Sequence, residues 1–243
     1  MQTYQFSPPA VTIAPSVQAG FSTAFDMADW QQGQPFPPSD AVGGTISKYG
    51  DWFTKNGNKD QITALANRPG SPGKGFRHWR GSPAGNGGGG LSISLPSAVT
   101  EVWVRFYMRY QAGFRWGGGG NPAYTKEHYW DNLIFGHQGG AWGLHTMQGN
   151  FPSSINWSQS QNGNIGDGLF HCYEYHARQG VNGIAEVWVD NLPALSQITN
   201  MGIGMWRSFG LGNNDSGTDS TTVDYYTDYD DLAISTNGRI GPL

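Results

Sequence analysis

Two alternating segments, residues 170–178 and 184–190, constrain the fold of this chain more than any other feature of its sequence. Gly180 and Gly183 lie in the short connection between them, which is typical of a β-hairpin. Side chains alternate between the two faces of a strand, so each arm has two chemically different faces. The first face carries His171, Tyr173, Tyr175, Ala177, Ala185, Val187 and Val189. The second face is rich in reactive groups and carries Cys172, Glu174, His176, Ile184, Glu186, Trp188 and Asp190.

Residues 101–110 predict a third strand of the same design, because apolar and polar side chains alternate along its whole length. The face expected in the core holds Val102, Val104, Phe106, Met108 and Tyr110. The opposite face holds Trp103, Arg105, Tyr107 and Arg109. Large planar and charged side chains therefore recur on one face of three predicted strands.

The composition favours a single large β domain. The chain has 243 residues with 37 glycines, 14% aromatic residues and only 13% charged residues. Short alternating segments separated by Gly- and Pro-rich turns predict an all-β fold, an antiparallel β-sandwich (jelly roll) of two sheets with long Gly/Pro-rich loops. Residues 1–19 are Pro-rich and nearly uncharged, so we expect an extended N-terminal arm followed by one domain over residues 20–243.

Charge and cysteine content exclude several classes of protein. The net charge of −4 gives no electrostatic basis for binding nucleic acid. Cys172 is the single cysteine and cannot form a disulfide within the chain. No apolar run is long enough to span a membrane, and the N-terminus lacks the basic and apolar regions of a signal peptide. We therefore expect no membrane partner, and the sequence shows no signal peptide.

The polar face of the three strands is the candidate binding surface. Aromatic rings stack on the C–H surfaces of sugars, while arginines and carboxylates bind hydroxyl and acidic groups. The candidate carbohydrate-binding residues are Trp103, Arg105, Tyr107, Arg109, Glu174, His176, Glu186 and Trp188. The alternative is a structural network in which Arg105 and Arg109 pair with Glu174 and Glu186 beneath a covering loop.

The hairpin register decides whether two glutamates could act together. If Glu174 is directly opposite Glu186, their carboxyl groups would be about 5 Å apart, the separation that retaining glycosidases use. A register shifted by two would pair His176 with Glu186 instead. Opposed carboxylates are more often neutralised by an arginine, which favours a structural interpretation of the pair.

A lyase mechanism needs a different set of residues. In β-elimination on a uronic-acid polymer, an arginine neutralises the carboxylate, a histidine or tyrosine removes the C5 proton, and a tyrosine protonates the leaving oxygen. The candidates for these catalytic roles are His137, His145, Tyr107, Arg105 and Arg109. A chain with 11 tyrosines supplies such sets by chance, so the pattern is not specific.

Acidic residues gather near the C-terminus, and Asp230 and Asp231 are the candidate metal ligands. Asp230 precedes Leu232 by two positions and Ile234 by four, so regular strand alternation places all three side chains on the same face. This predicts that Asp230 points inward and needs a partner. Carboxylate and carbonyl oxygens are the ligands that calcium prefers. The expected cofactor is therefore none or one structural calcium, with hydrogen bonds to loop backbone favoured over the metal.

The hairpin resembles a signature of the concanavalin A-like lectin/glucanase jelly-roll superfamily, which includes laminin-G-like and polysaccharide-lyase-like modules. The matching residues are Phe170–His176 and Glu186–Asp190, in the pattern WHxxExH…xxWxDG. Residues 73–77, 102–109, 229–235 and 239–241 resemble further strands and the C-terminal tail of that fold. The resemblance implies a jelly roll over residues 20–241. It also implies a glycan site on the concave sheet or its rim loops.

The enzyme motifs of the superfamily are missing. The chain lacks the ExDxxE strand of laminarinase-type hydrolases and the RxExR and QIH motifs of alginate lyases, and Asn191 stands where a turn glycine is usual. We therefore favour a non-catalytic lectin-like module over an enzyme. It would recognise a glycan or polysaccharide, form a surface component of an assembly, or both. The alternative is a polysaccharide lyase acting on an acidic glycan, and a glycoside hydrolase ranks below it.

The expected setting follows from the missing leader. A lectin-like protein made without a secretion signal suits a virion, whose proteins are made inside a host cell and work outside it. A phage decoration or tail protein is such a case. The uncharged arm, residues 1–19, would then contact neighbouring subunits. The localisation that the sequence suggests is thus a virion or an extracellular setting.

Overall fold

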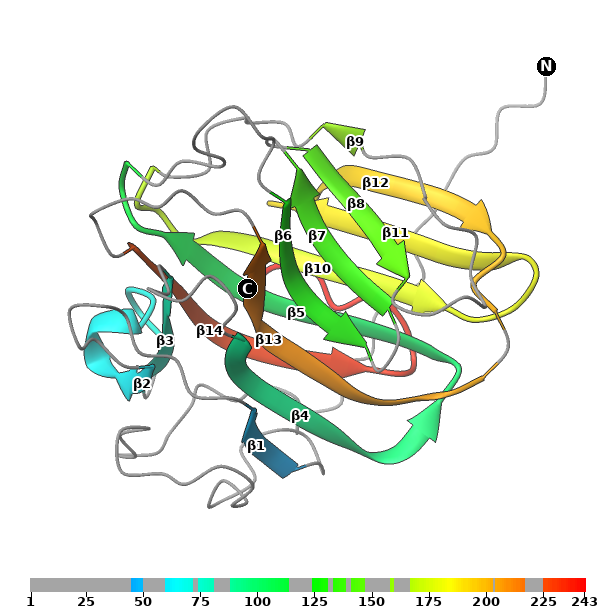
Figure 1. Cartoon of the computed structure of the whole chain (residues 1–243), viewed down its shortest axis with the longest axis horizontal. Helices are drawn as coiled ribbons and strands as arrows, with labels where there is room; N and C mark the ends of the chain where they lie inside the picture. Colours follow the sequence, from blue (N-terminus) through cyan, green and yellow to red (C-terminus); the bar gives the residue numbers. More distant parts are fainter. Residues whose placement is uncertain are drawn as a thin grey trace.

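The computed structural model describes residues 45–49, 60–71, 74–80, 88–113, 124–130, 133–138, 141–146, 158–159, 167–202, 204–216 and 225–243. Within these residues the chain forms two seven-stranded sheets packed face to face, with antiparallel pairing throughout (Figure 1). The predicted antiparallel β-sandwich is therefore confirmed. Among the described residues, no helix has the length and apolar character needed to cross a bilayer.

The order of the strands in space differs from their order in the sequence. Across the first sheet it is β1 (Thr45–Tyr49), β4 (Gly88–Val99), β13 (Trp206–Ser216), β6 (Tyr124–Trp130), β7 (Leu133–Gln138), β8 (Ala141–Thr146) and β9 (Ser158–Gln159). Across the second sheet it is β12 (Leu192–Thr199), β11 (Gly183–Val189), β10 (His171–Arg178), β5 (Glu101–Tyr110), β14 (Tyr225–Ser235), β3 (Gly75–Arg80) and β2 (Gln61–Thr63).

The predicted hairpin is strands β10 and β11, and the predicted strand 101–110 is β5. These three strands are neighbours at the centre of the second sheet, because β10 pairs with both β11 and β5. Strand β12 completes that edge of the sheet, although its sequence gives no clear alternation. Pro193 cannot donate a ladder hydrogen bond, which is tolerated in an edge strand, and the pairing shifts at a bulge beside Trp188.

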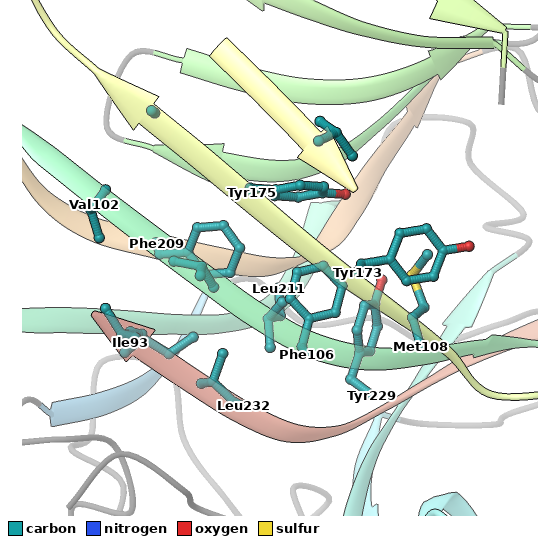
Figure 2. Close-up of a cluster of buried hydrophobic side chains, with 14 of the residues drawn as sticks. Ile93, Val102, Phe106, Met108, Tyr173, Tyr175, Phe209, Leu211, Tyr229 and Leu232 are labelled. Carbon is teal, nitrogen blue, oxygen red and sulfur yellow. The ribbon is translucent and has the colours of Figure 1, made fainter. Parts of the chain in front are cut away.

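The apolar faces of the two sheets meet in one core (Figure 2). The second sheet contributes Val102, Val104, Phe106, Met108, Tyr110, Tyr173, Tyr175 and Ala177, each at most 1% exposed. The first sheet contributes Leu91, Ile93, Phe209 and Leu211. The ring of Phe106 lies within 6.2 Å of four other rings, measured between centroids: Tyr173, Tyr175, Phe209 and Tyr229. The predicted core face of β5 is therefore confirmed.

A short segment after β2 packs against strand β3. It contains the 3-10 helix Ala64–Ala66, which begins where the Thr63 hydroxyl accepts a hydrogen bond from the Leu65 N–H. A Cβ atom on Gly75 would lie 2.0 Å from the Ala66 carbonyl oxygen. Only glycine permits this close approach, so the segment 60–71 is held tightly against the second sheet.

The predicted N-terminal arm, residues 1–19, lies outside the described residues, as does the start of the predicted domain at residue 20. Most of the predicted Gly/Pro-rich loop sequence also lies outside them. The arm, its boundary and its subunit contacts therefore stay predictions.

Candidate functional site

The candidate residues gather on the side of the second sheet that faces away from the core, which we call the outer face. The strand register places Arg105 opposite Glu174, Trp103 opposite His176, and Glu174 opposite Trp188. Because cross-strand partners share a face, the structure brings together all eight residues that the sequence singles out. They are Trp103, Arg105, Tyr107, Arg109, Glu174, His176, Glu186 and Trp188.

The register does not place the two glutamates directly opposite each other. Glu186 is opposite His176, and Glu174 is opposite Trp188. The direct Glu174–Glu186 opposition considered from the sequence is therefore wrong, and the shifted register is the correct one. The reason is the hairpin connection, which pairs Arg178 with Ile184 and fixes every later pair.

The C-terminal segment, residues 236–243, covers the middle of the outer face. The Glu174 carboxylate accepts hydrogen bonds from the backbone N–H groups of Ile240 at 2.6 Å and Gly241 at 3.1 Å, and from the Arg239 Nε at 3.2 Å. The Leu243 N–H donates to the Tyr107 hydroxyl at 2.9 Å. Burial also raises the pKa of Tyr107, although the hydrogen bond from Leu243 acts in the opposite direction.

The segment 60–71 covers the other end of the outer face, next to β3 and β14. There Asp228 accepts hydrogen bonds from Arg77 Nε at 2.7 Å and from an Arg109 terminal nitrogen at 2.6 Å. Both arginines also donate to the Leu65 carbonyl oxygen. A covered polar network therefore exists, as the alternative interpretation predicts. Its pairing differs, because Arg109 binds Asp228 and the Glu174 oxygens bind Arg239 and the C-terminal backbone.

The predicted inward direction of Asp230 is wrong. A bulge between Asp230 and Ala233 shifts the register of β14, and Asp231 has a φ of 49°. Asp230 is therefore opposite Tyr107 on the outer face, whereas Ile234 is opposite Val104 in the core. An extra residue in a strand reverses the parity that the sequence pattern assumes.

The two bulge carboxylates anchor the segment 60–71. The Arg68 N–H donates to Asp230 at 2.7 Å, the Ser71 hydroxyl donates to Asp231 at 2.5 Å, and the Arg68 side chain pairs with Asp231. Burial raises the pKa of Asp230, against the effect of the backbone N–H groups that it accepts from. The described part of the chain holds no group of three His, Cys, Asp or Glu side chains suited to a metal. Calcium at this pair stays a prediction, which a calcium titration would test.

The β10–β11 end of the outer face is less covered, and we call it the hairpin patch: Glu101, Trp103, His176, Glu186 and Trp188. The His176 ring lies between two carboxylates, with Nδ1 2.6 Å from Glu186 and Nε2 2.9 Å from Glu101. The Trp103 ring stacks on it with centroids 4.1 Å apart. The side chains of Glu101 and Glu186 are 34% and 24% exposed.

The electrostatics of the patch keep Glu186 charged. Burial raises the pKa of this carboxyl, but the hydrogen bond and the positive charge of His176 outweigh burial and lower it. The Ser196 hydroxyl adds a hydrogen bond at 3.2 Å. The patch therefore presents an ionised carboxylate beside two half-buried indole rings.

The lyase set does not converge on one face. Arg105, Tyr107 and Arg109 lie on β5 in the second sheet, whereas His137 lies on β7 and His145 on β8 in the first sheet. The β5 residues point away from that first sheet. Five residues chosen by chemistry alone are thus divided between the two layers of the sandwich.

Three residues that the sequence pattern did not single out shape the outer face. They are Asp228, Glu101 and Arg239, which lie in β14, at the start of β5 and in the C-terminal segment. Asp228 belongs to an acidic cluster that the sequence does show. Glu101 and Arg239 give no local signal, because their hydrogen-bond partners lie 48 or more positions away in the chain.

No family model matches the sequence, and no curated protein matches it. Solved structures are similar in fold. Cellulose induced protein Cip1 aligns with a TM-score of 0.55 at 16% identity, over 90% of this chain and 98% of that one. An alginate lyase, Aly36B, in complex with alginate trisaccharide, aligns with a TM-score of 0.52 at 16% identity, over 90% and 97%.

Botulinum neurotoxin type C, whose cell entry depends on two ganglioside molecules, aligns with a TM-score of 0.53 at 12% identity. The alignment covers 82% of this chain and 44% of that chain. At these identities the similarities establish the fold, a β-sandwich shared by proteins of different activities.

Proposed function

We propose that this protein is a non-catalytic glycan-recognition module of the concanavalin A-like jelly-roll type. The observation that carries the proposal is the hairpin patch, where Trp103 and Trp188 lie half-buried beside the partly exposed carboxylates of Glu101 and Glu186. This combination is suited to sugars, because indole rings stack on C–H surfaces while carboxylates accept hydrogen bonds from hydroxyl groups.

The patch is also preorganised. His176 makes hydrogen bonds with both glutamates, and its ring stacks on Trp103 at an interplanar angle of 7°. Side chains held in place before a ligand arrives lose little conformational entropy on binding. A rigid patch of this kind favours recognition of a sugar without a moving catalytic group.

The structural neighbours support a glycan as the ligand class. One neighbour binds an alginate trisaccharide, and another depends on gangliosides for cell entry. The sequence resemblance to lectin-like jelly rolls points to the same class. A glycan that is acidic or neutral suits the proposal equally, because the hairpin patch contains both carboxylates and aromatic rings.

A glycan array tests the proposal. Full-length protein should bind at least one glycan, and Trp103→Ala or Trp188→Ala should weaken that binding by about tenfold or more, since stacking on an aromatic ring contributes about 1–2 kcal/mol. The matched control is Trp79→Ala, a half-buried tryptophan on β3 at the other end of the same sheet. Binding that survives both patch variants would place the site elsewhere.

A second candidate is a polysaccharide lyase, favoured by the similarity to an alginate lyase over 90% of this chain. Its test is the ultraviolet absorbance of unsaturated product after incubation with alginate and other uronate polymers. Product formation that is lost in His137→Ala or His145→Ala would replace the non-catalytic proposal. An assay without product on any of these polymers would remove the lyase.

An assembly role rests on the predicted arm, residues 1–19, and on the virion setting that the sequence suggests. Removing residues 1–19 should convert a multimer into a monomer, with the molar mass measured by light scattering. A monomer at micromolar concentration with the arm intact would argue against subunit contacts through it.

A further inference from the structure

We propose that the C-terminal segment occupies a second saccharide site on the outer face, and that the ligand of this site is a saccharide bearing a carboxylate. The inference rests on the glycan-binding function proposed above and extends it to the neighbouring part of the same sheet, which shares Trp188 with the hairpin patch. The site consists of Arg105, Glu174 and Trp188, and its present occupants are residues 239–241 of the same chain.

Arg105 is the strongest indication of a missing anionic ligand. Its side chain is buried, with the residue only 2% exposed, yet its Nε has no hydrogen-bond partner among the described residues. One terminal nitrogen reaches the Gly241 carbonyl oxygen at a long 3.4 Å. A buried guanidinium is costly without a partner, and its planar fork matches a carboxylate.

Glu174 and Asp231 both interact electrostatically with Arg105, but among the described residues neither carboxylate makes a hydrogen bond with it, although Glu174 is directly opposite in the register. The two Glu174 oxygens instead accept the backbone N–H groups of Ile240 and Gly241 and the side chain of Arg239. Neighbouring hydroxyl groups of a sugar would donate the same hydrogen bonds. The C-terminal segment therefore provides hydrogen-bond donors for the Glu174 carboxylate. It provides no hydrogen-bond acceptor for the buried Nε of Arg105.

Trp188 provides the third contact. The guanidinium carbon of Arg239 lies 4.4 Å from the centre of its ring, and the same side chain donates to the Asn191 side chain at 2.6 Å. A pyranose ring stacks on indole in the same way. The three contacts together match one sugar acid: a carboxylate on Arg105, hydroxyls on Glu174 and a ring face on Trp188.

The segment is held in a way that allows exchange. Leu243 is 55% exposed, so the last residue buries little apolar surface. Gly238 and Gly241 have φ values of 145° and 76°, and a Cβ on either would touch nothing within 4 Å. The contacts of the segment with the sheet are polar and partly buried, and such contacts open more readily than a packed apolar core.

The single cysteine reports on this opening in the full-length protein. Cys172 is buried on the outer face, opposite Tyr107. Its thiol makes a hydrogen bond with the Tyr107 hydroxyl, which also accepts a hydrogen bond from the Leu243 N–H. Burial raises the pKa of the Cys172 thiol to about 11, so the closed form reacts slowly with thiol reagents. Release of the segment should expose it.

The experiment compares Arg239→Gln with Arg207→Gln, an exposed arginine on β13 of the other sheet. Arg239→Gln should raise the rate of Cys172 alkylation about tenfold, since the charge-assisted hydrogen bonds of Arg239 to Glu174 and Asn191 are lost. It should also tighten binding of alginate trisaccharide, measured by calorimetry, while leaving neutral cellotriose unchanged. Arg207→Gln should change neither quantity. Circular dichroism at each stage checks that the fold is intact.

The opposite outcomes overturn the inference. If Arg239 itself binds the acidic sugar, Arg239→Gln weakens alginate trisaccharide binding, and the segment is then part of an open site. Faster alkylation with unchanged affinity would mean that the segment opens but covers no saccharide site. In both cases glycan binding through the hairpin patch would stand. If neither the wild type nor Arg239→Gln binds any glycan on the array, the proposed function fails together with the inference.

Discussion

The two faces of strands β5 and β10 are both buried, but for different physical reasons. On the inner face, Phe106 and Tyr175 are fully buried by the opposite sheet. On the outer face, Arg105 and Glu174 are 2% exposed, and short segments rather than a sheet cover them. The two faces are therefore equally buried, but the inner face belongs to an apolar core and the outer face to a polar network.

The difference shows what each face depends on. Apolar burial is non-directional, so the inner face needs volume and shape. Polar burial is directional, so each group on the outer face needs a particular partner at a particular angle. Substitutions should therefore reveal cavity formation on one side and unpaired charge on the other.

The largest effect is expected on the inner face. Phe106→Ala should lower the free energy of unfolding by about 3–5 kcal/mol, because it leaves a cavity among four aromatic rings. Chemical denaturation measures the change. The matched control is Leu65→Ala, whose side chain is mostly exposed, with an expected change below about 0.5 kcal/mol. Equal losses in the two variants would contradict the assignment of the core.

Asp228→Asn, on the outer face, should lower the free energy of unfolding almost as much. The substitution removes the charge that neutralises Arg77 and Arg109 while keeping the shape, and we expect a loss of about 3 kcal/mol. Because the pair is buried, added salt should change this loss little. The control is Asp167→Asn, an exposed carboxylate, for which denaturation should show less than about 1 kcal/mol.

Gly75→Ala tests the covering segment rather than the sheet. The new methyl group would overlap the Ala66 carbonyl oxygen, so the segment 60–71 must move away, at a cost of about 2 kcal/mol. Hydrogen exchange should rise at the amides of this segment before those of β5. Gly113→Ala is the control: it has a positive φ but no close neighbour, and only the backbone cost of about 1 kcal/mol applies.

The smallest effect concerns pH. Burial lowers the pKa of His171, but hydrogen bonds from its ring to Asp190 and Asp167 outweigh burial and raise it. A raised folded-state pKa means that the contribution is fully present below the unfolded value of about 6.5 and is lost as pH rises through the folded value. His171→Gln should therefore cost about 0.5–1 kcal/mol at acidic pH and less at alkaline pH. A difference that grows with pH would contradict the sign.

Local pattern predicted the sheet but not its cover. Alternation in residues 101–110 and 170–190 was enough to place Trp103, Glu174 and Trp188 on one face, because strand geometry alone fixes which side chains share a side. The identity of the covering segments depends on contacts between distant parts of the chain. Arg239 gives no local sign that it will reach Glu174.

Strand alternation predicted the wrong face for Asp230, because the backbone of β14 departs from regular strand geometry there. The bulge at Asp230–Ala233 moved one carboxylate to the outer face, against the expectation from Leu232 and Ile234. A bulge is stabilised by tertiary contacts, in this case with Arg68 and Ser71, which follow β2 far away in sequence. No window of residues around Asp230 contains that information.

The sequence by itself determined a β-sandwich, its core face on β5 and the polar composition of the outer face. These follow from the two-residue period of a strand, which is a local property. Only the tertiary structure decided that Glu174 accepts hydrogen bonds from the C-terminal segment, that Asp228 joins two arginines and that the hairpin patch remains partly exposed. Those outcomes depend on which distant segments reach the sheet, because directional hydrogen bonds select their partners by position in space and not by distance along the chain.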